Sequence, residues 1–166
     1  MTLSLPTSPR QFFVAGARVQ VLNLASVIPF GLAAGAFTAN AFHSAAQAAS
    51  LHALMFAGRG QMVAMQLYQE GAPLAFLLLA ALVVNLRNMM YGAALARHFG
   101  HLSWPWRLVL AFLLVDLVYA MSIGVLEREA GTLNAAACHY YYLGSGVTVF
   151  LCWSLAGVAG AALGAS

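Results

Sequence analysis

The sequence predicts an all-α integral membrane protein, a polytopic bundle of helices in a single transmembrane domain over residues 1–166. Of its 166 residues, 63% are hydrophobic and 7% are charged, and the mean hydropathy is +0.84. An ordinary soluble domain carries about a quarter charged residues, so this chain needs lipid as its surroundings. Glycine and alanine are abundant and alternating ten-residue segments are absent, so helices rather than a membrane barrel satisfy the backbone. A crossing takes roughly 20 apolar residues, which leaves room for about five helical segments in the bilayer.

The first two membrane segments, residues 19–42 and 45–68, are predicted to be broken. Pro29 lies in the middle of the first segment, where its ring removes one helical hydrogen bond and clashes with the preceding turn. We expect a kink or a break there. Gly58-Arg59-Gly60 interrupts the second segment, and polar residues such as Gln61 make it the least lipid-like of the set. This segment is therefore either buried or discontinuous.

The other three segments are predicted to cover residues 72–96, 106–126 and 139–164. The third segment begins apolar and then turns polar at Asn85 and Arg87, so its second half must face protein or water. The fourth segment is apolar except for Asp116 near its centre. The fifth ends in Gly160-Ala-Ala-Leu-Gly164, a small-xxx-small pattern typical of close helix packing. Gly31-Leu-Ala-Ala-Gly35 in the first segment predicts the same kind of packing.

The arginines conflict with five full crossings. The N-terminal tail, with Arg10, Phe12 and Arg18, predicts a short interfacial helix. The loop with Arg97 and Arg107 would lie on the opposite side of the membrane after three full crossings, against the positive-inside rule. The conflict disappears if one of the first two segments does not cross completely, as discontinuous transporter helices behave.

The charges and cysteines also exclude several kinds of partner. All seven basic residues are arginines scattered along the chain, so the formal charge of +3 is no nucleic-acid footprint, and we expect no nucleic-acid partner. Cys138 and Cys152 lack the spacing of a metal site or a disulfide framework. His98 and His101 have i, i+3 spacing, but no carboxylate or cysteine accompanies them, and interfacial histidines are the preferred interpretation. We expect neither metal nor cofactor.

Arg87 and Asp116 are predicted to partner each other. Each lies about ten residues from the loop between its segments, so at 1.5 Å per residue both sit roughly 15 Å deep. An intramembrane charge costs about 2.5–3.5 kcal/mol and marks a substrate path by default. With Asn85 nearby, Arg87 could hold a carboxylate and Asp116 an ammonium or a proton, which suits a zwitterion. The alternative is a buried structural ion pair.

A second candidate site lies at Gly58-Arg59-Gly60-Gln61. If a half-helix begins here, its free amides and its dipole would attract an anionic group, and Gln61 would orient that group. The alternative is that Gly58 and Gly60 serve only close packing.

Several spaced motifs resemble the branched-chain amino acid permease family of bacterial exporters, the azaleucine-resistance or AzlC type. The resemblance covers nearly the whole chain and is most specific at Asn85-Leu86-Arg87. The other motifs that carry it are Ile28-Pro29-Phe30-Gly31, Phe56-Ala57-Gly58 with Gln61, Tyr91-Gly92, Trp106-Arg107 with Asp116, and Tyr141-Tyr142-Leu143-Gly144.

The chain also departs from the family pattern. Leu117 stands where a second acid is usual, Asn88 where histidine is common, and Arg59 in a place that is normally small. Family members tend to continue past the glycine-rich segment. A fragment, a short paralogue or half of an assembly is therefore expected.

The resemblance implies export of valine, leucine or other hydrophobic amino acids from a bacterial inner membrane, together with a small AzlD-type membrane partner. An intramembrane enzyme is not expected, because the predicted segments contain no serine–lysine pair, paired catalytic aspartates or metal-ligating helix. In that role, Arg87 and the amides near Gly60 would take the substrate carboxylate, and Phe30 would be among the contacts of its side chain. Alternating access would require movement at Pro29 and Gly58. The alternatives are a non-transporting scaffold or regulatory subunit, and a channel; an oligomer is left open.

Overall fold

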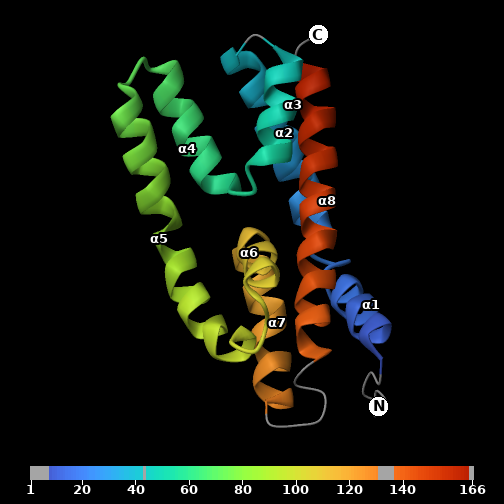
Figure 1. Ribbon diagram of the computed structural model, residues 1–166. Helices are drawn as coiled ribbons and strands as arrows, with labels where there is room; N and C mark the ends of the chain where they lie inside the picture. Colours follow the sequence, from blue (N-terminus) through green and yellow to red (C-terminus); the bar gives the residue numbers. More distant parts are fainter. Residues whose placement is uncertain (1–7, 43, 131–136, 165–166) are drawn as a thin grey trace. The chain divides into compact units, whose positions relative to one another are not determined.

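The structure is a computed structural model and describes residues 8–42, 44–130 and 137–164. These residues form eight helices and no strand, so the all-α prediction is confirmed. In chain order the helices are α1 (Pro9–Val19), α2 (Leu24–Phe42), α3 (Ala45–Leu54), α4 (Gly58–Gln69), α5 (Leu74–Phe99), α6 (Trp104–Phe112), α7 (Asp116–Glu129) and α8 (Cys138–Gly164) (Figure 1).

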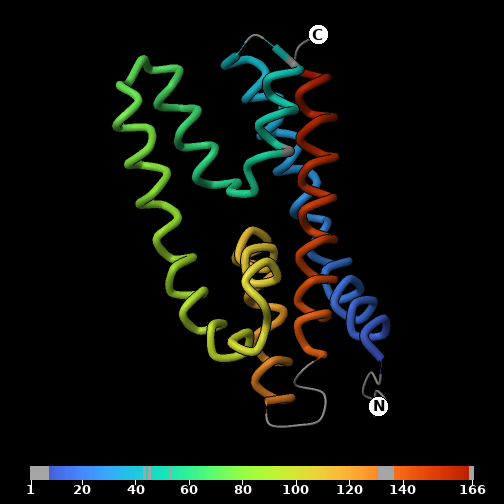
Figure 2. The backbone as a smooth tube through the Cα atoms, viewed as in Figure 1, coloured from blue at the N-terminus to red at the C-terminus, as the bar shows by residue number. Residues whose placement is uncertain are grey.

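Among the described residues, three helices are long and apolar enough to cross a membrane: α2, α5 and α8. The other two predicted segments are each split into a pair of shorter helices, α3 with α4 and α6 with α7. Within each pair the second helix runs back against the first, as the tube in Figure 2 shows. Each pair therefore turns back toward its own starting side, and the chain is a membrane protein with three candidate crossings.

The helices form two compact units. One unit contains the described parts of residues 1–23 and 90–149, and is called here the α6–α7 unit. The other contains the described parts of 24–89 and 150–166, and is called the α3–α4 unit. Helices α5 and α8 contribute one half to each, so each unit combines one turned-back pair with halves of two long helices.

The predicted break at Pro29 is wrong, because α2 runs through this proline as one helix. Pro29 lies in the second turn, so the hydrogen bond that it removes concerns only the carbonyl of Ala25 near the helix start. The turns that follow Pro29 pack against α8, and this tertiary contact keeps the helix continuous.

The break in the second segment precedes the two glycines. Helix α3 ends at Leu54, Met55 has extended backbone (φ −113°, ψ 103°), and α4 begins at Gly58. Gly58 and Gly60 thus lie in the first turn of α4 instead of between the helices. Their missing side chains leave room for side chains of other helices, and this close packing accounts for the two glycines in the first turn of α4.

The fourth segment, predicted to be continuous, has a break of its own. Helix α6 ends at Phe112, Val115 is extended (φ −134°, ψ 165°), and α7 begins at Asp116. The broken stretch is Leu113-Leu114-Val115, which contains neither proline nor glycine. The one local signal is Asp116 itself, because a carboxylate in the first turn is stabilised by the helix dipole.

Helices α2 and α8 approach closely through glycines in the α3–α4 unit. A Cβ on Gly35 would overlap the carbonyl of Gly157, and a Cβ on Gly160 would overlap the carbonyl of Leu32. On Gly31, a Cβ would lie 2.8 Å from the Cβ of Ala156. The predicted packing roles of the two small-xxx-small patterns are therefore confirmed, since each helix offers bare backbone to the other.

The predicted N-terminal helix is present as α1 and packs on α8 in the α6–α7 unit. Ser8 caps it by accepting a hydrogen bond from the Gln11 amide (3.4 Å), and Pro9 follows at the first helical position. Phe12 is 2% exposed, and a Cβ on Gly16 would overlap the carbonyl of Tyr141. One face of this helix is thus buried against protein.

Candidate functional site

Three fully buried polar side chains meet in the α3–α4 unit: Thr38 of α2, His52 of α3 and Gln61 of α4. The Gln61 Nε2 atom lies 3.1 Å from His52 Nε2 and donates to Thr38 Oγ1 over 3.4 Å. Thr38 Oγ1 in turn donates to the Ala34 carbonyl (2.7 Å). With the Gln61 amide oriented in this way, its nitrogen donates to His52 Nε2 in the ring tautomer whose Nε2 accepts. We call these three residues the Gln61 cluster.

The Gln61 cluster has an unused acceptor. Gln61 Oε1 is buried and has no hydrogen-bond partner among the described residues. A buried acceptor without a donor costs about 1–3 kcal/mol, so such a group calls for water or a ligand. Of the three side chains, only Gln61 is among the predicted site residues. Thr38 and His52 could have been found as polar residues on the helix faces that pack against protein rather than lipid.

An aromatic pair lies between the Gln61 cluster and the start of α4. The Trp153 ring is 5.2 Å from the His52 ring and 5.6 Å from the Phe30 ring, between centroids. A Cβ on Gly58 would lie 3.1 Å from both Phe30 and Trp153, so the missing side chain of Gly58 admits the pair. The predicted site residues Phe30 and Gly58 are therefore in contact. Trp153, which is not among the predicted site residues, forms the other side of this apolar surface.

The start of α4 is without a side-chain cap. Its N-cap residue is Ala57, which has no side chain that can accept, and only from Gln61 onward do amides bond within the helix (Gln61 N to Ala57 O, 2.9 Å). The first-turn amides, including those of Gly58 and Gly60, thus have no partner in the helix itself. The prediction that a half-helix begins at these glycines is confirmed, and its positive dipole end is available to an anion.

An amide pair on α5 lies against the same turn. A Cβ on Gly60 would overlap Asn85 Nδ2, which donates to the Ala81 carbonyl (2.8 Å). Asn88 Nδ2 donates to Asn85 Oδ1 (3.4 Å). Gly60 and Asn85, both predicted site residues, are therefore in direct contact, and the asparagine stands where a substrate group at the α4 start would be within reach.

Arg87 and Asp116 lie in different units. Arg87 is half-buried on α5 in the α3–α4 unit, and Asp116 is half-buried in the first turn of α7 in the α6–α7 unit. Their pairing stays a prediction. Pro29 is exposed on α2 beside Phe30.

A second buried amide holds the start of α7. Gln20 is fully buried, and its Nε2 donates to Ser145 Oγ (2.6 Å) and to the Leu117 carbonyl (3.3 Å). Its Oε1 accepts from Asn23 Nδ2 (2.9 Å). The glutamine therefore ties the stretch before α2 to the turn that carries Asp116. Sequence reasoning missed it, because a single glutamine beside a loop gives no local sign of burial.

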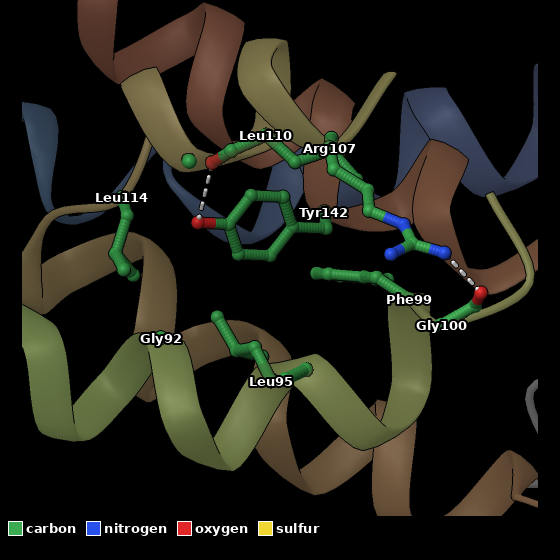
Figure 3. A pocket seen from close by; sticks show the side chains of 10 residues that line it. Gly92, Leu95, Phe99, Gly100, Arg107, Leu110, Leu114 and Tyr142 are labelled. Carbon is green, nitrogen blue, oxygen red and sulfur yellow. Dashed lines mark hydrogen bonds between the residues drawn. The ribbon is translucent and has the colours of Figure 1, made fainter. Parts of the chain in front are cut away.

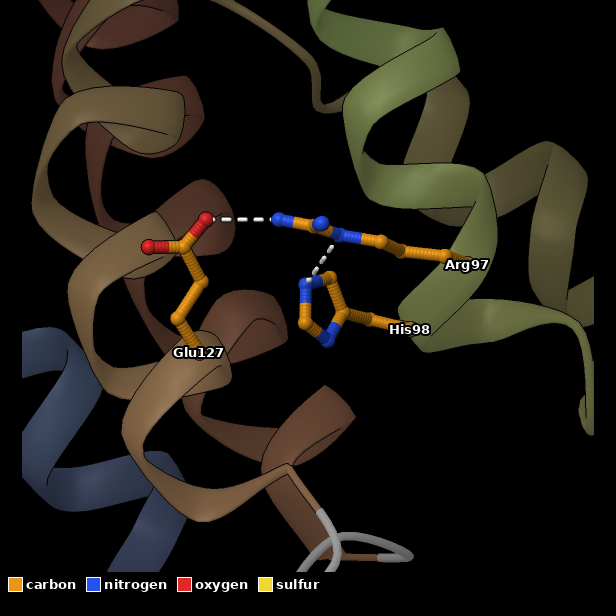
Figure 4. A network of polar contacts seen from close by, with 3 residues as sticks. All are labelled: Arg97, His98 and Glu127. Atoms are coloured by element: carbon orange, nitrogen blue, oxygen red, sulfur yellow. Dashed lines mark hydrogen bonds and ion pairs between the residues drawn. The ribbon is translucent and has the colours of Figure 1, made fainter.

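The interfacial histidines of α5 and its loop have ordinary partners. His98 Nε2 accepts from Arg97 Nε (3.1 Å), while Arg97 Nη2 binds Glu127 Oε1 at 2.6 Å (Figure 4). The His101 ring packs edge-on against His139, with centroids 6.1 Å apart. These contacts join α5 to α7 and α8 within the α6–α7 unit.

One protein-family model matches residues 23–166, and the family is described as AzlC protein. No curated protein and no solved structure matched the chain.

Proposed function

The chain belongs to the AzlC family, which is associated with branched-chain amino acid transport, and on this premise we propose that it exports branched-chain or other hydrophobic amino acids. The proposed place is a bacterial inner membrane, with a small AzlD-type membrane protein as partner. The observation that carries the proposal is the uncapped start of α4, which lies between an amide pair and an aromatic pair.

The substrate carboxylate is proposed to bind the first-turn amides of α4. Backbone amides and the dipole favour an anion there, as at the half-helix sites of other transporters. Asn85 supplies a side-chain amide in contact with Gly60. Arg87, two residues further along α5, adds the positive charge that a carboxylate prefers.

The aliphatic side chain of the substrate is proposed to rest on the aromatic pair. Phe30 and Trp153 form an apolar wall directly at Gly58. Phe56, in the break before α4, continues this wall by packing edge-on against Phe150 at 5.4 Å. A pocket with an apolar wall and a few polar donors is typical of small-molecule sites and suits leucine or valine.

The break between α3 and α4 is proposed to be the moving part. Met55 (φ −113°, ψ 103°) and Ala57 (φ −143°, ψ 52°) have non-helical backbone, so the angle between α3 and α4 is proposed to change here. The Gln61 cluster joins the two helices directly beside this hinge. Asp116, at the break before α7 in the other unit, is proposed to carry a coupling proton.

The test is efflux of radiolabelled leucine and valine from preloaded proteoliposomes, with and without a co-reconstituted AzlD-type partner. We compare the unaltered chain with Gln61→Met, which keeps the volume of the side chain and removes the amide. The matched control is Gln66→Met, the same change on the exposed face of α4. Saturable efflux that falls in Gln61→Met alone supports the proposal. Absence of efflux in every arm favours the scaffold or regulatory subunit, and equal efflux in both variants contradicts the role of the Gln61 cluster beside the break.

A further inference from the structure

The α6–α7 unit contains an apolar slot that the proposed transport site does not use. Its volume is about 210 Å³. The last turns of α5 form one wall, α6 and Leu114 form the other, and the Tyr142 ring of α8 lies between the two walls (Figure 3). Every lining residue belongs to this unit, whereas the start of α4 belongs to the other.

The slot is long, and apart from Arg107 at one end its lining is mostly apolar. It follows the end of α5 from Gly92 to Phe99, which is about 10 Å of helix, and continues to Gly100. This is much longer than a leucine or valine side chain. The one buried polar group, the Tyr142 hydroxyl, is already satisfied by donating to the Leu110 carbonyl at 3.2 Å. The slot therefore fits an extended alkyl chain better than an amino acid.

Arg107 stands at one end of the slot, beside Gly100 and away from Gly92 (Figure 3). Its Nε donates to the Leu102 carbonyl (2.8 Å), and Nη2 donates to the Gly100 carbonyl. These two bonds hold the guanidinium over the slot end while the side chain remains exposed. The structure gives Nη1 no protein acceptor among the described residues, so this nitrogen can still donate to a ligand.

Two tryptophans place this end of the slot at the level of the lipid headgroups. Trp104 is 69% exposed and Trp106 is 37% exposed, and both lie within one turn of Arg107 at the start of α6. Exposed tryptophans concentrate at the membrane–water interface. A cation at this depth, directly above a hydrocarbon-sized slot, meets the phosphate of a lipid.

We propose that the slot binds one acyl chain of an anionic phospholipid, whose phosphate pairs with Arg107. Charge complementarity selects the anionic headgroup, and the length of the slot selects the acyl chain. Bound lipid would fill the space between α5 and α6 and so stabilise the α6–α7 unit. The proposal does not depend on the transported substrate.

The first test measures binding of phosphatidylglycerol to the purified full chain by native mass spectrometry, with phosphatidylcholine and glycerol phosphate as comparison ligands. We expect phosphatidylglycerol to bind, glycerol phosphate alone not to bind, and Arg107→Gln to weaken phosphatidylglycerol binding about fivefold or more. The matched control is Arg97→Gln, which removes an arginine already paired with Glu127 and should change binding less than about twofold. Equal losses in both variants would show a general surface charge effect and overturn the proposal.

A plug in the slot tests the acyl chain separately from the headgroup. A Cβ on Gly92 would meet only Leu114 Cδ2, at 3.7 Å, so Gly92→Leu projects its side chain into the slot. Gly124→Leu is the control, since nothing lies within 4 Å of a Cβ there. We expect Gly92→Leu alone to abolish phosphatidylglycerol binding; retained binding would overturn the proposal.

A third measurement uses the unaltered chain and does not depend on whether a variant folds. Phosphatidylglycerol with a diazirine in its acyl chain is photolysed on the protein, and the labelled residues are mapped. Labels at Leu95 and Leu110, which are buried in the absence of lipid, are the expected result. Labels confined to the exposed face of α5, at Leu82 or Met89, would show surrounding lipid only and overturn the proposal.

Discussion

Gln61 of α4 and His52 of α3 meet across the break at residues 55–57, with their Nε2 atoms 3.1 Å apart and both side chains fully buried. The pair lies nine positions apart in the chain on two different helices. It joins the two helices of the turned-back pair next to the start of α4, which has no side-chain cap. Any movement of α4 against α3 changes this contact first.

Gly157→Ala should displace His52 and disturb the Gln61 cluster. A Cβ on Gly157 would lie 2.5 Å from both His52 Cγ and His52 Nδ1. Overpacking of this kind costs typically about 1–3 kcal/mol, so we expect a lower Tm in detergent together with reduced efflux. The control is Gly124→Ala, where a Cβ meets nothing and a helical alanine should be neutral or slightly stabilising. Unchanged Tm in Gly157→Ala would contradict the tight contact between α8 and His52.

Gly16→Ala should detach α1 from α8. A Cβ at this position would overlap the Tyr141 carbonyl, which is backbone and cannot move aside cheaply. The readout is reaction of a cysteine at Phe12→Cys with a maleimide, because Phe12 is 2% exposed while α1 is docked. We expect fast labelling only when Gly16→Ala is present. Equally slow labelling in both backgrounds would mean that α1 tolerates the added methyl group.

The turned-back pairs predict one membrane orientation. Among the described residues between Arg18 and Arg97, only α2 and α5 are long and apolar enough to cross, so we expect both ends of this stretch to face the same side. Arg10, Arg107 and Arg128 share that side, and the positive-inside rule places it in the cytoplasm. The conflict that arises from five full crossings is thereby removed.

Single cysteines can check this orientation in a chain that first carries Cys138→Ser and Cys152→Ser. A membrane-impermeant maleimide applied to intact cells should label Gln69→Cys, at the last residue of α4. It should leave Ser8→Cys and His101→Cys unlabelled until the cells are opened. If Ser8→Cys and His101→Cys label from opposite sides, the α3–α4 pair crosses and the orientation is wrong.

The ion pair between Arg97 and Glu127 should contribute little to stability. Its oxygen and nitrogen are 2.6 Å apart, but the two side chains are 62% and 54% exposed. Water and salt screen such a pair, and its loss typically costs less than about 1 kcal/mol. We expect Glu127→Gln to shift the detergent Tm slightly at low salt and not measurably at high salt. A large shift that persists in high salt would show that the network with His98 is buried in the membrane.

Asp116→Asn should reduce efflux without preventing folding. The amide keeps the size of the side chain but can neither carry a proton nor attract an ammonium. The control is Glu127→Gln, an equal change of charge on an exposed carboxylate of the same helix. Proteoliposome efflux that is lost in Asp116→Asn and kept in Glu127→Gln supports a transport role. Full efflux in both would assign Asp116 to the helix start alone.

Local sequence was enough for the extents of the segments and for the glycine contacts. Membrane crossing depends on the apolar content of a window, so α2, α5 and α8 begin and end within a few residues of their predicted limits. The patterns at Gly31–Gly35 and Gly160–Gly164 predicted close packing because spacing along a helix places both glycines of each pattern on one face.

The breaks and the partners of the polar residues were decided by tertiary structure. Pro29 did not break α2, since contacts with α8 outweigh one lost hydrogen bond, whereas the apolar Leu113-Leu114-Val115 did end a helix. The meeting of Thr38, His52 and Gln61 also requires three separate helices to be placed against one another. Hydropathy and spacing act within one helix and therefore determine which segments enter the membrane. Contacts between helices determine where those segments turn back and which buried polar groups are paired. The reason is that a polar group at a helix end or on a buried side chain needs a partner that its own helix does not supply.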